Sequence, residues 1–298
     1  MSEQQQPAAP AATAPEILRY TAFSTSPDGG NPAGVVLDAG GLDAPSRQRI
    51  AAEVGYSETA FLTPPPPELA AEAGSSGRAF TIRYHSPEAE VDFCGHATVA
   101  TAVALAERHG PGNYAFATRA GVVPVTVDDE LRATLTSVPP RISDITDVDL
   151  TAVLEALRWS PADLDPALPA RIAYAGNDHL VLAAATRARL ADLDYDFDAL
   201  RALMLRLGLT TLQLVWRESE TVFHVRDPFP VGGVVEDPAT GAAAAAFGGY
   251  LRLLDLAPDG AVLTLHQGED MGRPGLLTVT LPEDDPRIHV SGTATALR

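Results

Sequence analysis

One glutamate in the N-terminal third lies where proton-transfer chemistry would need it. If residues 56–62 form an extended strand, Glu58 shares a face with Tyr56, Ala60 and Leu62, while polar residues such as Ser57 and Thr59 lie on the opposite face. A carboxyl group on that apolar face is desolvated, and desolvation raises its pKa towards the range useful for proton transfer near neutral pH. The same pattern also suits a glutamate on an edge strand that points into water. The residues alone leave both interpretations open.

Two further groups of candidates precede two unusual uncharged segments. Residues 92–96 read Asp-Phe-Cys-Gly-His, and residues 236–241 read Glu-Asp-Pro-Ala-Thr-Gly. If each group leads into a helix, it lies beside unpaired amide groups and a partial positive charge. Two such N-termini that meet in one cleft would attract an anion such as a substrate carboxylate. Ordinary helix capping by Asp237 or Thr240 is the alternative interpretation.

Motifs for cofactors and metals are absent from the sequence. It contains no phosphate-binding loop that ends in Lys-Ser/Thr and no dinucleotide fingerprint after a strand. It also lacks a His-Glu-x-x-His motif, a cysteine cluster for zinc and a serine nucleophile elbow. His85 and His96 are close to Cys94, but their spacing matches no metal template. We therefore predict a reaction that needs only proton transfer, with no cofactor and no metal site.

The elements that must position these residues include two similar helices. His96–Glu107 carries no charge before Glu107, and Gly241–Leu251 is again uncharged and rich in small residues. A helix that is apolar on every side is a buried helix. The glycines that start the two segments, Gly95 and Gly241, are 146 positions apart, about half the chain. The repeat predicts two lobes, each a curved, mostly antiparallel sheet around one central helix, although alanine-rich buried helices also occur singly.

Shorter patterns predict the remaining elements. Helical spacing occurs at 45–54, 150–159 and 197–207, and residues 64–77, with four consecutive prolines, are expected to form a surface loop or insertion. Apolar or alternating runs predict strands at 17–23, 33–37, 56–62, 80–85, 122–127, 131–138, 212–216, 222–225, 262–266 and 276–281.

Composition and charge exclude several classes of partner. The chain has 298 residues, of which 46% are hydrophobic and 20% charged, with a mean hydropathy near zero, as in globular proteins. Its 21 basic and 39 acidic residues give a net charge of −18. Such a field repels phosphate backbones, and no basic cluster offsets it, so we expect no nucleic-acid partner.

The cysteine count and the N-terminus bear on the compartment. Cys94 is the only cysteine, so no internal disulfide can form and nothing favours an oxidising compartment. Residues 1–15 are rich in Ala, Pro and Gln, contain no Lys or Arg, and are expected to be a disordered leader. No apolar run approaches the ~20 residues of a membrane span. We predict a cytoplasmic protein without a membrane partner.

Five short stretches follow one another in order and at sensible spacing: Gly30–Val35, Ser57–Phe61, Phe93–Thr98, Glu236–Ala242 and Gln267–Pro274. Together they resemble the PhzF family of phenazine-biosynthesis-like isomerases. The resemblance extends from about Ile17 to Gly292. It implies an α+β, diaminopimelate-epimerase-like fold with two pseudo-symmetric lobes, which agrees with the repeat. We place an N-terminal lobe at 16–120, a C-terminal lobe at 121–285 and a segment at 286–298 that returns to the N-terminal lobe.

The resemblance also implies roles for individual residues. Glu58 matches the acid/base glutamate of the family, which moves a proton between carbons, and His96 and Asp237 match its active-site histidine and aspartate. The amides of Gly241 and Ala242 would bind a substrate carboxylate, and we expect Gly95 to bind substrate as well. Asn31 is expected to shape the cleft wall. The resemblance further implies a small carboxylate-bearing substrate and a homodimer.

Two departures from the phenazine enzyme weaken the case for the same aromatic substrate. Ala242 and Gly275 stand where that enzyme has serines. Two other functions stay open. One is a thiol-type racemase or epimerase, similar to proline racemase or diaminopimelate epimerase, that would use Cys94 with a second base such as Asp237. The other is a non-catalytic binding protein that keeps the cleft without turnover.

Overall fold

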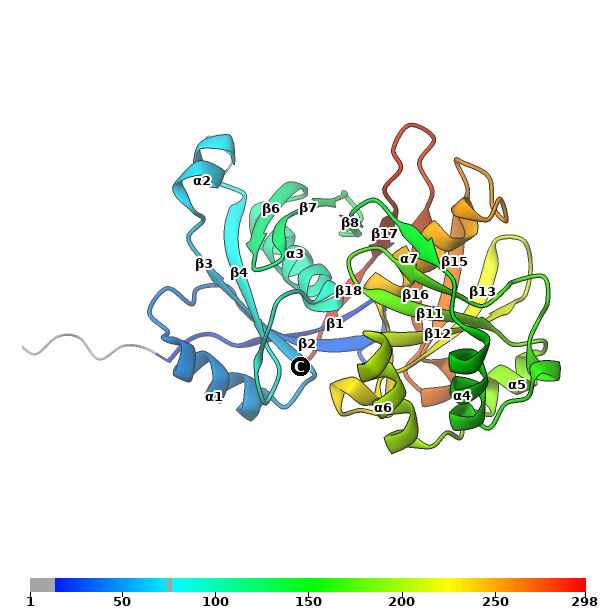
Figure 1. Ribbon diagram of the computed structural model, residues 1–298. Coiled ribbons are helices and arrows are strands. Elements are labelled where there is room, and N and C mark those ends of the chain that lie inside the picture. Colours follow the sequence, from blue (N-terminus) through cyan, green and yellow to red (C-terminus); the bar gives the residue numbers. More distant parts are fainter. Residues whose placement is uncertain (1–13, 74–76) are drawn as a thin grey trace, which may run out of the picture.

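Two buried helices, α3 (Gly95–His109) and α7 (Gly241–Leu253), organise the molecule. The structure is a computed structural model that describes residues 14–73 and 77–298. Figure 1 shows α3 among the blue and teal strands on one side and α7 among the green to orange strands on the other. The expected leader therefore lies outside the described residues, except for its last two positions.

The first half of the chain supplies the elements around α3. Its helices besides α3 are α1 (Ala44–Val54) and α2 (Pro67–Ala73). Its strands are β1 (Leu18–Ala22), β2 (Asn31–Val36), β3 (Glu58–Thr63), β4 (Ala79–His85), β5 (Glu90–Val91), β6 (Gly112–Thr118), β7 (Gly121–Val127), β8 (Ala133–Thr136) and β9 (Arg141–Ser143).

The second half supplies the elements around α7. Its other helices are α4 (Asp147–Leu157), α5 (Arg187–Ala191) and α6 (Phe197–Leu207), with short 3₁₀ turns at 161–163, 230–232 and 269–271. Its strands are β10 (Arg171–Tyr174), β11 (Asp178–Ala183), β12 (Thr211–Arg217), β13 (Val222–Pro228), β14 (Glu236–Asp237), β15 (Val262–Gln267), β16 (Gly275–Thr280), β17 (His289–Gly292) and β18 (Ala294–Ala296).

The strand pairings repeat between the two halves. The parallel pairs β2–β3 and β4–β6 correspond to the parallel pairs β11–β12 and β13–β15. The antiparallel pairs β3–β4, β4–β5 and β6–β7 correspond to β12–β13, β13–β14 and β15–β16. Each set surrounds one central helix. The predicted α+β fold with two pseudo-symmetric, mostly antiparallel lobes is therefore confirmed.

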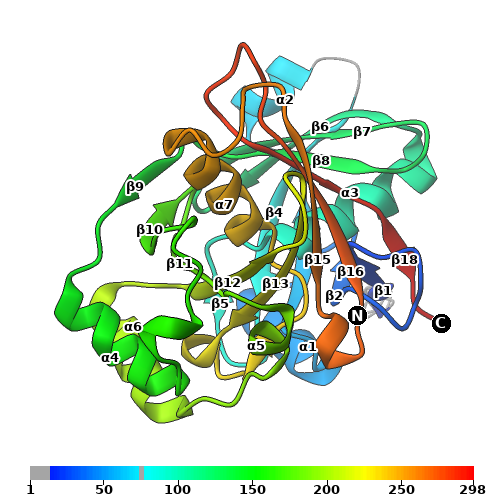
Figure 2. The ribbon, with the colours of Figure 1, turned by 90° about the vertical axis from the view of Figure 1, so that its right-hand side faces the viewer.

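Strands exchanged between the halves join the two lobes. β9 pairs with β10, and the C-terminal β18 pairs with β1, both antiparallel. The last strand of each half therefore lies beside the first strand of the other half. β8 also pairs with β17. In Figure 2 the red C-terminal strand β18 lies next to the blue β1 and β2. The described strands thereby form one continuous sheet that crosses between the lobes.

Small residues let the sheet approach the central helices closely. Residues 96–106 of α3 are all buried, and most of α7 is buried as well. A Cβ atom at Gly248 would lie 2.7 Å from a methyl carbon of Val279, and one at Gly249 would lie 2.3 Å from Pro140. Larger side chains would force the strands away from α7.

The expected loop at residues 64–77 is wrong in its middle part, because residues 67–73 form α2. Proline is tolerated in the first turn of a helix, where its missing N–H has no intrahelical partner. The residues that follow Pro67, Glu-Leu-Ala-Ala-Glu-Ala, are strong helix formers. The proline run therefore begins a helix instead of excluding one.

The structure also contains elements that the sequence patterns missed, among them β6, β10, β11 and β18. None of the helices within residues 14–73 and 77–298 is long and apolar enough to cross a membrane.

Candidate active site

The N-termini of α3 and α7 face each other between the lobes. An ideal Cβ atom on Gly95 would lie 3.9 Å from the amide nitrogen of Ala242 and 3.9 Å from the Cα atom of Gly241. Cys94 and Thr240 are the N-cap residues, and neither side chain caps its helix. The amides of Gly95, Gly241 and Ala242 thus have no capping side chain among the described residues, which suits them to an anion.

Two adjoining cavities open at this junction. The larger has a volume of about 680 Å³ and the inner one about 80 Å³, and both are lined by Glu58, Gly95, Gly241 and Ala242. His96 and Asp237 line the inner cavity only. The larger volume is in the range of small-molecule sites. Six of the seven predicted site residues therefore meet at one place, and Asn31 lies behind them.

Glu58 is the first residue of β3 and reaches towards α3. Its Oε2 atom lies 3.3 Å from Nε2 of His96, and burial raises the pKa of its carboxyl group above the usual range. Ala60 and Leu62 share its face and belong to the core around α3. The opposite face is not polar, because Phe61 packs against α1 there. The alternation that singled out Glu58 is therefore weaker than expected, although its side chain is largely buried.

Asn31 connects the two lobes beneath the inner cavity. Its Nδ2 atom donates to Oδ1 of Asp237 at 2.7 Å and to the carbonyl oxygen of Ala239 at 3.1 Å, which fixes the orientation of the amide. The same nitrogen lies 3.1 Å from Nδ1 of His96. The amide has two hydrogens for these three neighbours, so one hydrogen is shared between two of them. Because an amide nitrogen cannot accept a hydrogen bond, the contact favours an unprotonated Nδ1. Burial lowers the pKa of His96, so the ring is neutral and its one proton lies on Nε2, facing Glu58.

Asp237 is the second buried carboxyl group of the cavity. Burial, together with the nearby Glu58 carboxyl group, raises its pKa to about 6, and hydrogen bonds from Thr240 and Asn31 limit the rise. The Thr240 hydroxyl donates to Oδ2 of Asp237 at 2.6 Å. Both hydrogen bonds favour the ionised form, and with a pKa of about 6 Asp237 is mainly a carboxylate at pH 7.

A layer of buried polar groups behind Asp237 was missed by the sequence analysis. Gln267 donates from Nε2 to the backbone oxygen of Asp237 at 2.9 Å and to Oδ2 of Asp227 at 3.2 Å. Burial raises the pKa of Asp227 well above its usual range. Arg226 donates from Nε to Oε1 of Glu236 at 2.9 Å. Gln267 was part of a recognised motif, but nothing in the local pattern distinguishes Asp227 or Arg226 from ordinary strand residues.

Cys94 lies beside Glu58 and His96 but holds its own proton tightly. Its Sγ atom is 3.4 Å from Nδ1 of His96. Burial raises the pKa of the thiol well above its usual range, and the nearby Glu58 raises it further. A protonated thiol is a poor base and a poor nucleophile.

The arrangement around His96 does not suit a resident metal ion. Glu58, Cys94 and His96 are the one group of three potential ligands that lie within 4.8 Å of one another in the described residues. A ligating histidine donates its second ring N–H to an acceptor. Here Nδ1 of His96 faces the donor amide of Asn31, which leaves the proton on the nitrogen that faces Glu58.

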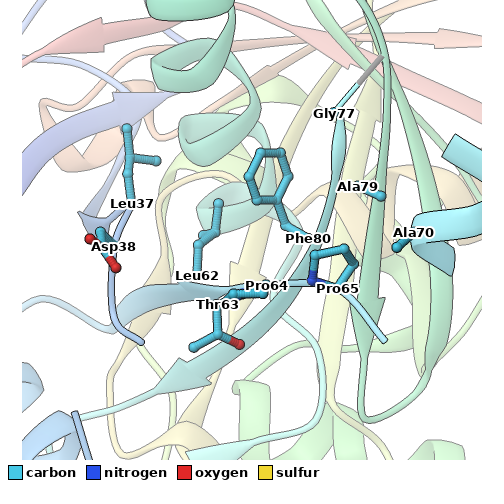
Figure 3. A pocket seen from close by; sticks show the side chains of 10 residues that line it. All are labelled: Leu37, Asp38, Leu62, Thr63, Pro64, Pro65, Ala70, Gly77, Ala79 and Phe80. Atoms are coloured by element: carbon cyan, nitrogen blue, oxygen red, sulfur yellow. The ribbon is translucent and has the colours of Figure 1, made fainter. Parts of the chain in front are cut away.

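A separate cavity of about 340 Å³ lies in the N-terminal lobe, away from the helix N-termini (Figure 3). Leu62, Phe80 and Pro65 are among the mainly apolar residues that line it, and Asp38 is its one titratable side chain. It lacks the group of buried titratable side chains that lines the interlobe cavities, so the interlobe cavities are the candidate site.

Comparison with solved structures places the fold among isomerase folds. A phenazine biosynthesis protein of the PhzF family from Bacillus anthracis superposes with a TM-score of 0.80 at 27% identity, over 95% of this chain and 96% of that one. A probable proline racemase from Agrobacterium radiobacter superposes with a TM-score of 0.65 at 14% identity, over 94% and 90% of the two chains. The second likeness shows a shared fold alone.

The chain belongs to the family of phenazine biosynthesis-like proteins (PhzC-PhzF), whose model matches residues 20–298. An uncharacterized isomerase of Escherichia coli, YddE, is 33% identical over 298 residues, which cover 95% of this chain and 96% of the relative. The trans-2,3-dihydro-3-hydroxyanthranilate isomerase of Pseudomonas chlororaphis is 30% identical, over 91% and 93% of the two chains. The protein is an isomerase of this family.

Proposed function

We propose that the protein moves a proton between carbon atoms of a small carboxylate-bearing substrate, without a cofactor, and that Glu58 is the acid and base. The observation that carries this proposal is the position of Glu58. Its buried carboxyl group lines both cavities and lies 3.3 Å from Nε2 of a neutral His96.

The proton step uses Glu58 in both directions. The Glu58 carboxylate takes a proton from a carbon of the substrate, and the electron pair of the broken C–H bond delocalises into the conjugated system next to that carbon. The resulting carboxylic acid then returns the proton to a second carbon, so that atoms and charge balance. A raised pKa suits both halves of this exchange, because a general acid–base group works best when its pKa lies near the working pH.

The remaining site residues would hold the substrate and Glu58 in place. The N–H on Nε2 of His96 donates towards Oε2 of Glu58 and orients it. The first amides of α3 and α7, from Gly95, Gly241 and Ala242, would bind the substrate carboxylate. Asp237 is held by Asn31 and Thr240 on the far side of His96, where its negative charge stabilises any positive charge on the ring.

The thiol-type racemase is the weaker alternative. Its mechanism would need two bases, Cys94 and a second one such as Asp237, and burial keeps Cys94 protonated by raising the pKa of its thiol. Thr240, the N-cap residue that corresponds to Cys94 in the other lobe, has no acid–base function near neutral pH. A binding protein without turnover is disfavoured because Glu58, His96 and Asp237 all line one cavity.

The natural substrate is a further part of the proposal. The relative from Pseudomonas chlororaphis is named for trans-2,3-dihydro-3-hydroxyanthranilate. Ala242 lines both cavities without the hydroxyl that the phenazine enzyme has at this position, so we propose a different small acid for this chain. The lobe boundaries at 16–120, 121–285 and 286–298, the homodimer and the cytoplasmic location stay predictions.

Deuterium exchange tests the role of Glu58. The protein is incubated in deuterated water with a panel of small dienoic acids and amino acids, including trans-2,3-dihydro-3-hydroxyanthranilate, and label at carbon is followed by NMR. We expect Glu58→Gln to slow exchange by a factor of about 10² to 10⁴, the usual contribution of a general acid–base group. Glu90→Gln is the matched control, since Glu90 is on β5 in the same half of the chain but lines neither cavity. Exchange by Glu58→Gln at the wild-type rate would refute the assignment.

A further inference from the structure

A buried histidine of the C-terminal lobe lines the inner cavity, and the mechanism above gives it no task. His179 is on β11, is 0% exposed, and borders the cavity together with Asp237 and Ala242. Alternate residues of β11 face opposite sides of the sheet. Val181 belongs to the core around α7 and Leu180 to the cluster under α4 and α6, so His179 faces α7.

One ring nitrogen of His179 has a hydrogen-bond partner, and the other has none. Its Nδ1 atom lies 2.8 Å from Oγ1 of Thr211, the residue that pairs with His179 across the parallel strands β11 and β12. Within residues 14–73 and 77–298, Nε2 has no hydrogen-bond partner although it is fully buried. Thr211 also borders the inner cavity. A buried polar atom without a partner is unusual in a folded protein and requires an explanation.

The number of protons on His179 and Thr211 determines which hydrogen-bonding groups are left without a partner. Burial lowers the pKa of His179 to about 3, so the imidazole is neutral and carries one N–H. If the Thr211 hydroxyl donates to Nδ1, only the N–H on Nε2 lacks a partner. If Nδ1 donates to Thr211, both the hydroxyl hydrogen and the Nε2 lone pair lack one. The first arrangement leaves fewer groups unsatisfied and is the more stable.

We infer that the Nε2–H group of His179 donates a hydrogen bond to an oxygen atom of the substrate inside the inner cavity. His179 is then a specificity-determining residue for acids that carry a second oxygen, as a hydroxyl, carbonyl or carboxyl group. This inference rests on the proposed function for the location of the substrate. It assigns the carboxylate end to the helix N-termini and the second oxygen to the C-terminal lobe.

An uncharged donor discriminates in a particular way. It prefers an oxygen without requiring charge, and a substrate that lacks the oxygen leaves a buried N–H unpaired in the complex. A site with such a donor strongly rejects a ligand that lacks the matching oxygen. An apolar pocket rejects a ligand with an additional hydroxyl group less strongly. Because the imidazole stays neutral above about pH 4, this preference should not change between pH 5 and 8.

Ligand affinity tests the inference without turnover. Benzoate and its 2-, 3- and 4-hydroxy derivatives serve as probes in isothermal titration calorimetry. We expect at least one hydroxy derivative to bind wild type about tenfold more tightly than benzoate, as one hydrogen bond to a neutral donor allows. His179→Phe should abolish that preference while the affinity for benzoate itself changes little.

His85→Phe is the matched control. His85 is also buried, its Nδ1 atom is bonded to Gln48 at 2.9 Å, and its Nε2 atom likewise has no partner in the described part of the chain. It lines neither interlobe cavity. We expect His85→Phe to keep the wild-type preference. A preference that survives in His179→Phe, or that no derivative shows with wild type, overturns the inference.

A spectroscopic measurement keeps the inference testable if His179→Phe does not fold. In ¹⁵N-labelled wild type, the ring nitrogens of His179 should report a neutral ring protonated on Nε2, and the preferred hydroxybenzoate should shift the Nε2–H signal. A proton on Nδ1, or no shift on binding, overturns the inference. Binding and deuterium exchange are separate measurements. Exchange by Glu58→Gln at the wild-type rate would refute only the proposed function. Absence of the expected hydroxyl preference in wild type would refute only the role of His179.

Discussion

The two lobes share one backbone plan but present different side chains at matching positions. Ala33 pairs with Glu58 across β2 and β3, and His179 pairs with Thr211 across the corresponding strands β11 and β12. Thr211 in the C-terminal lobe thus occupies the position that Glu58 has in the N-terminal lobe. His179 occupies the position of Ala33.

The central helices differ in the same way. Cys94 and His96 begin α3, and Thr240 and Ala242 stand at the same two positions of α7. The short strands β5 and β14 match as well, so that Val91 of β5 corresponds to Asp237 of β14. Under the proposed function, the N-terminal lobe supplies the base Glu58 and the imidazole of His96, and the C-terminal lobe supplies the carboxylate of Asp237 and neutral donors. A duplicated scaffold has become an asymmetric site, and neither lobe holds a complete set of groups.

Removal of the charge of Asp237 should have the largest effect among the tests of this asymmetry. We expect Asp237→Asn to lower the exchange rate by a factor of about 10² or more, because the negative charge beside His96 is lost. The same variant should be more stable than wild type at pH 8. The pKa of Asp237 is about 6 in the folded protein against an ordinary value of 3.8, so the folded state binds the proton more tightly than the unfolded state does.

The sign of the stability change follows from this difference. As pH rises from about 4 to 6, the unfolded chain releases the proton first, and the folded state loses stability relative to it. Above pH 6 the cost is complete and amounts to roughly 3 kcal/mol. Urea denaturation should therefore show an advantage for Asp237→Asn at pH 8 that shrinks towards pH 4. Asp285→Asn is the control of opposite sign, since Arg287 lowers the pKa of Asp285. A loss of stability at pH 8 in Asp237→Asn would contradict the prediction.

The two glycines at the helix N-termini allow a second, smaller test. A Cβ atom at Gly95 would meet Ala242 and Gly241 at 3.9 Å, an ordinary contact, whereas one at Gly241 would lie 3.3 Å from the ring of Phe23. Neither glycine has a positive φ. We expect Gly95→Ala to fold normally but to bind benzoate about tenfold more weakly, because the methyl group displaces the carboxylate from the amides. Calorimetric titration measures this, and unchanged affinity would place the carboxylate elsewhere.

Gly241→Ala should affect folding as well as binding. Its methyl group must push the Phe23 ring by a few tenths of an ångström, and Phe23 is fully buried. We therefore expect a lower denaturation midpoint for Gly241→Ala than for Gly95→Ala. Equal midpoints would mean that the Phe23 ring moves without cost.

The sequence predicted the scaffold better than the details of the site. The uncharged runs that begin at Gly95 and Gly241 revealed both central helices because a helix without a polar face must be buried. The same runs revealed the duplication. β10, β11 and β18 were missed because β10 and β18 are short, and because β11 begins with Asp178 and His179, which interrupt its apolar pattern.

The site residues depended on contacts that local patterns do not contain. Asn31 is 206 positions from Asp237 in the sequence, and the 2.7 Å hydrogen bond between them exists only because the lobes meet. Motif resemblance found Glu58, His96 and Asp237, whereas alternation misjudged the second face of β3. His179 belonged to no motif. Only its burial without a partner for Nε2 draws attention to it.

Substitution of Cys94 should have the smallest effect. The result distinguishes the proposed Glu58 mechanism from a mechanism in which the thiol is the base. Cys94 has a threonine at its matching position, and burial keeps its own proton in place. We expect Cys94→Ser to exchange deuterium within about threefold of wild type, since Glu58 moves the proton and serine keeps a hydrogen bond to His96. Iodoacetamide should also leave wild-type exchange unchanged, because only a thiolate reacts and Cys94 stays a thiol. A loss of a thousandfold or more in Cys94→Ser would show instead that the thiol is the base.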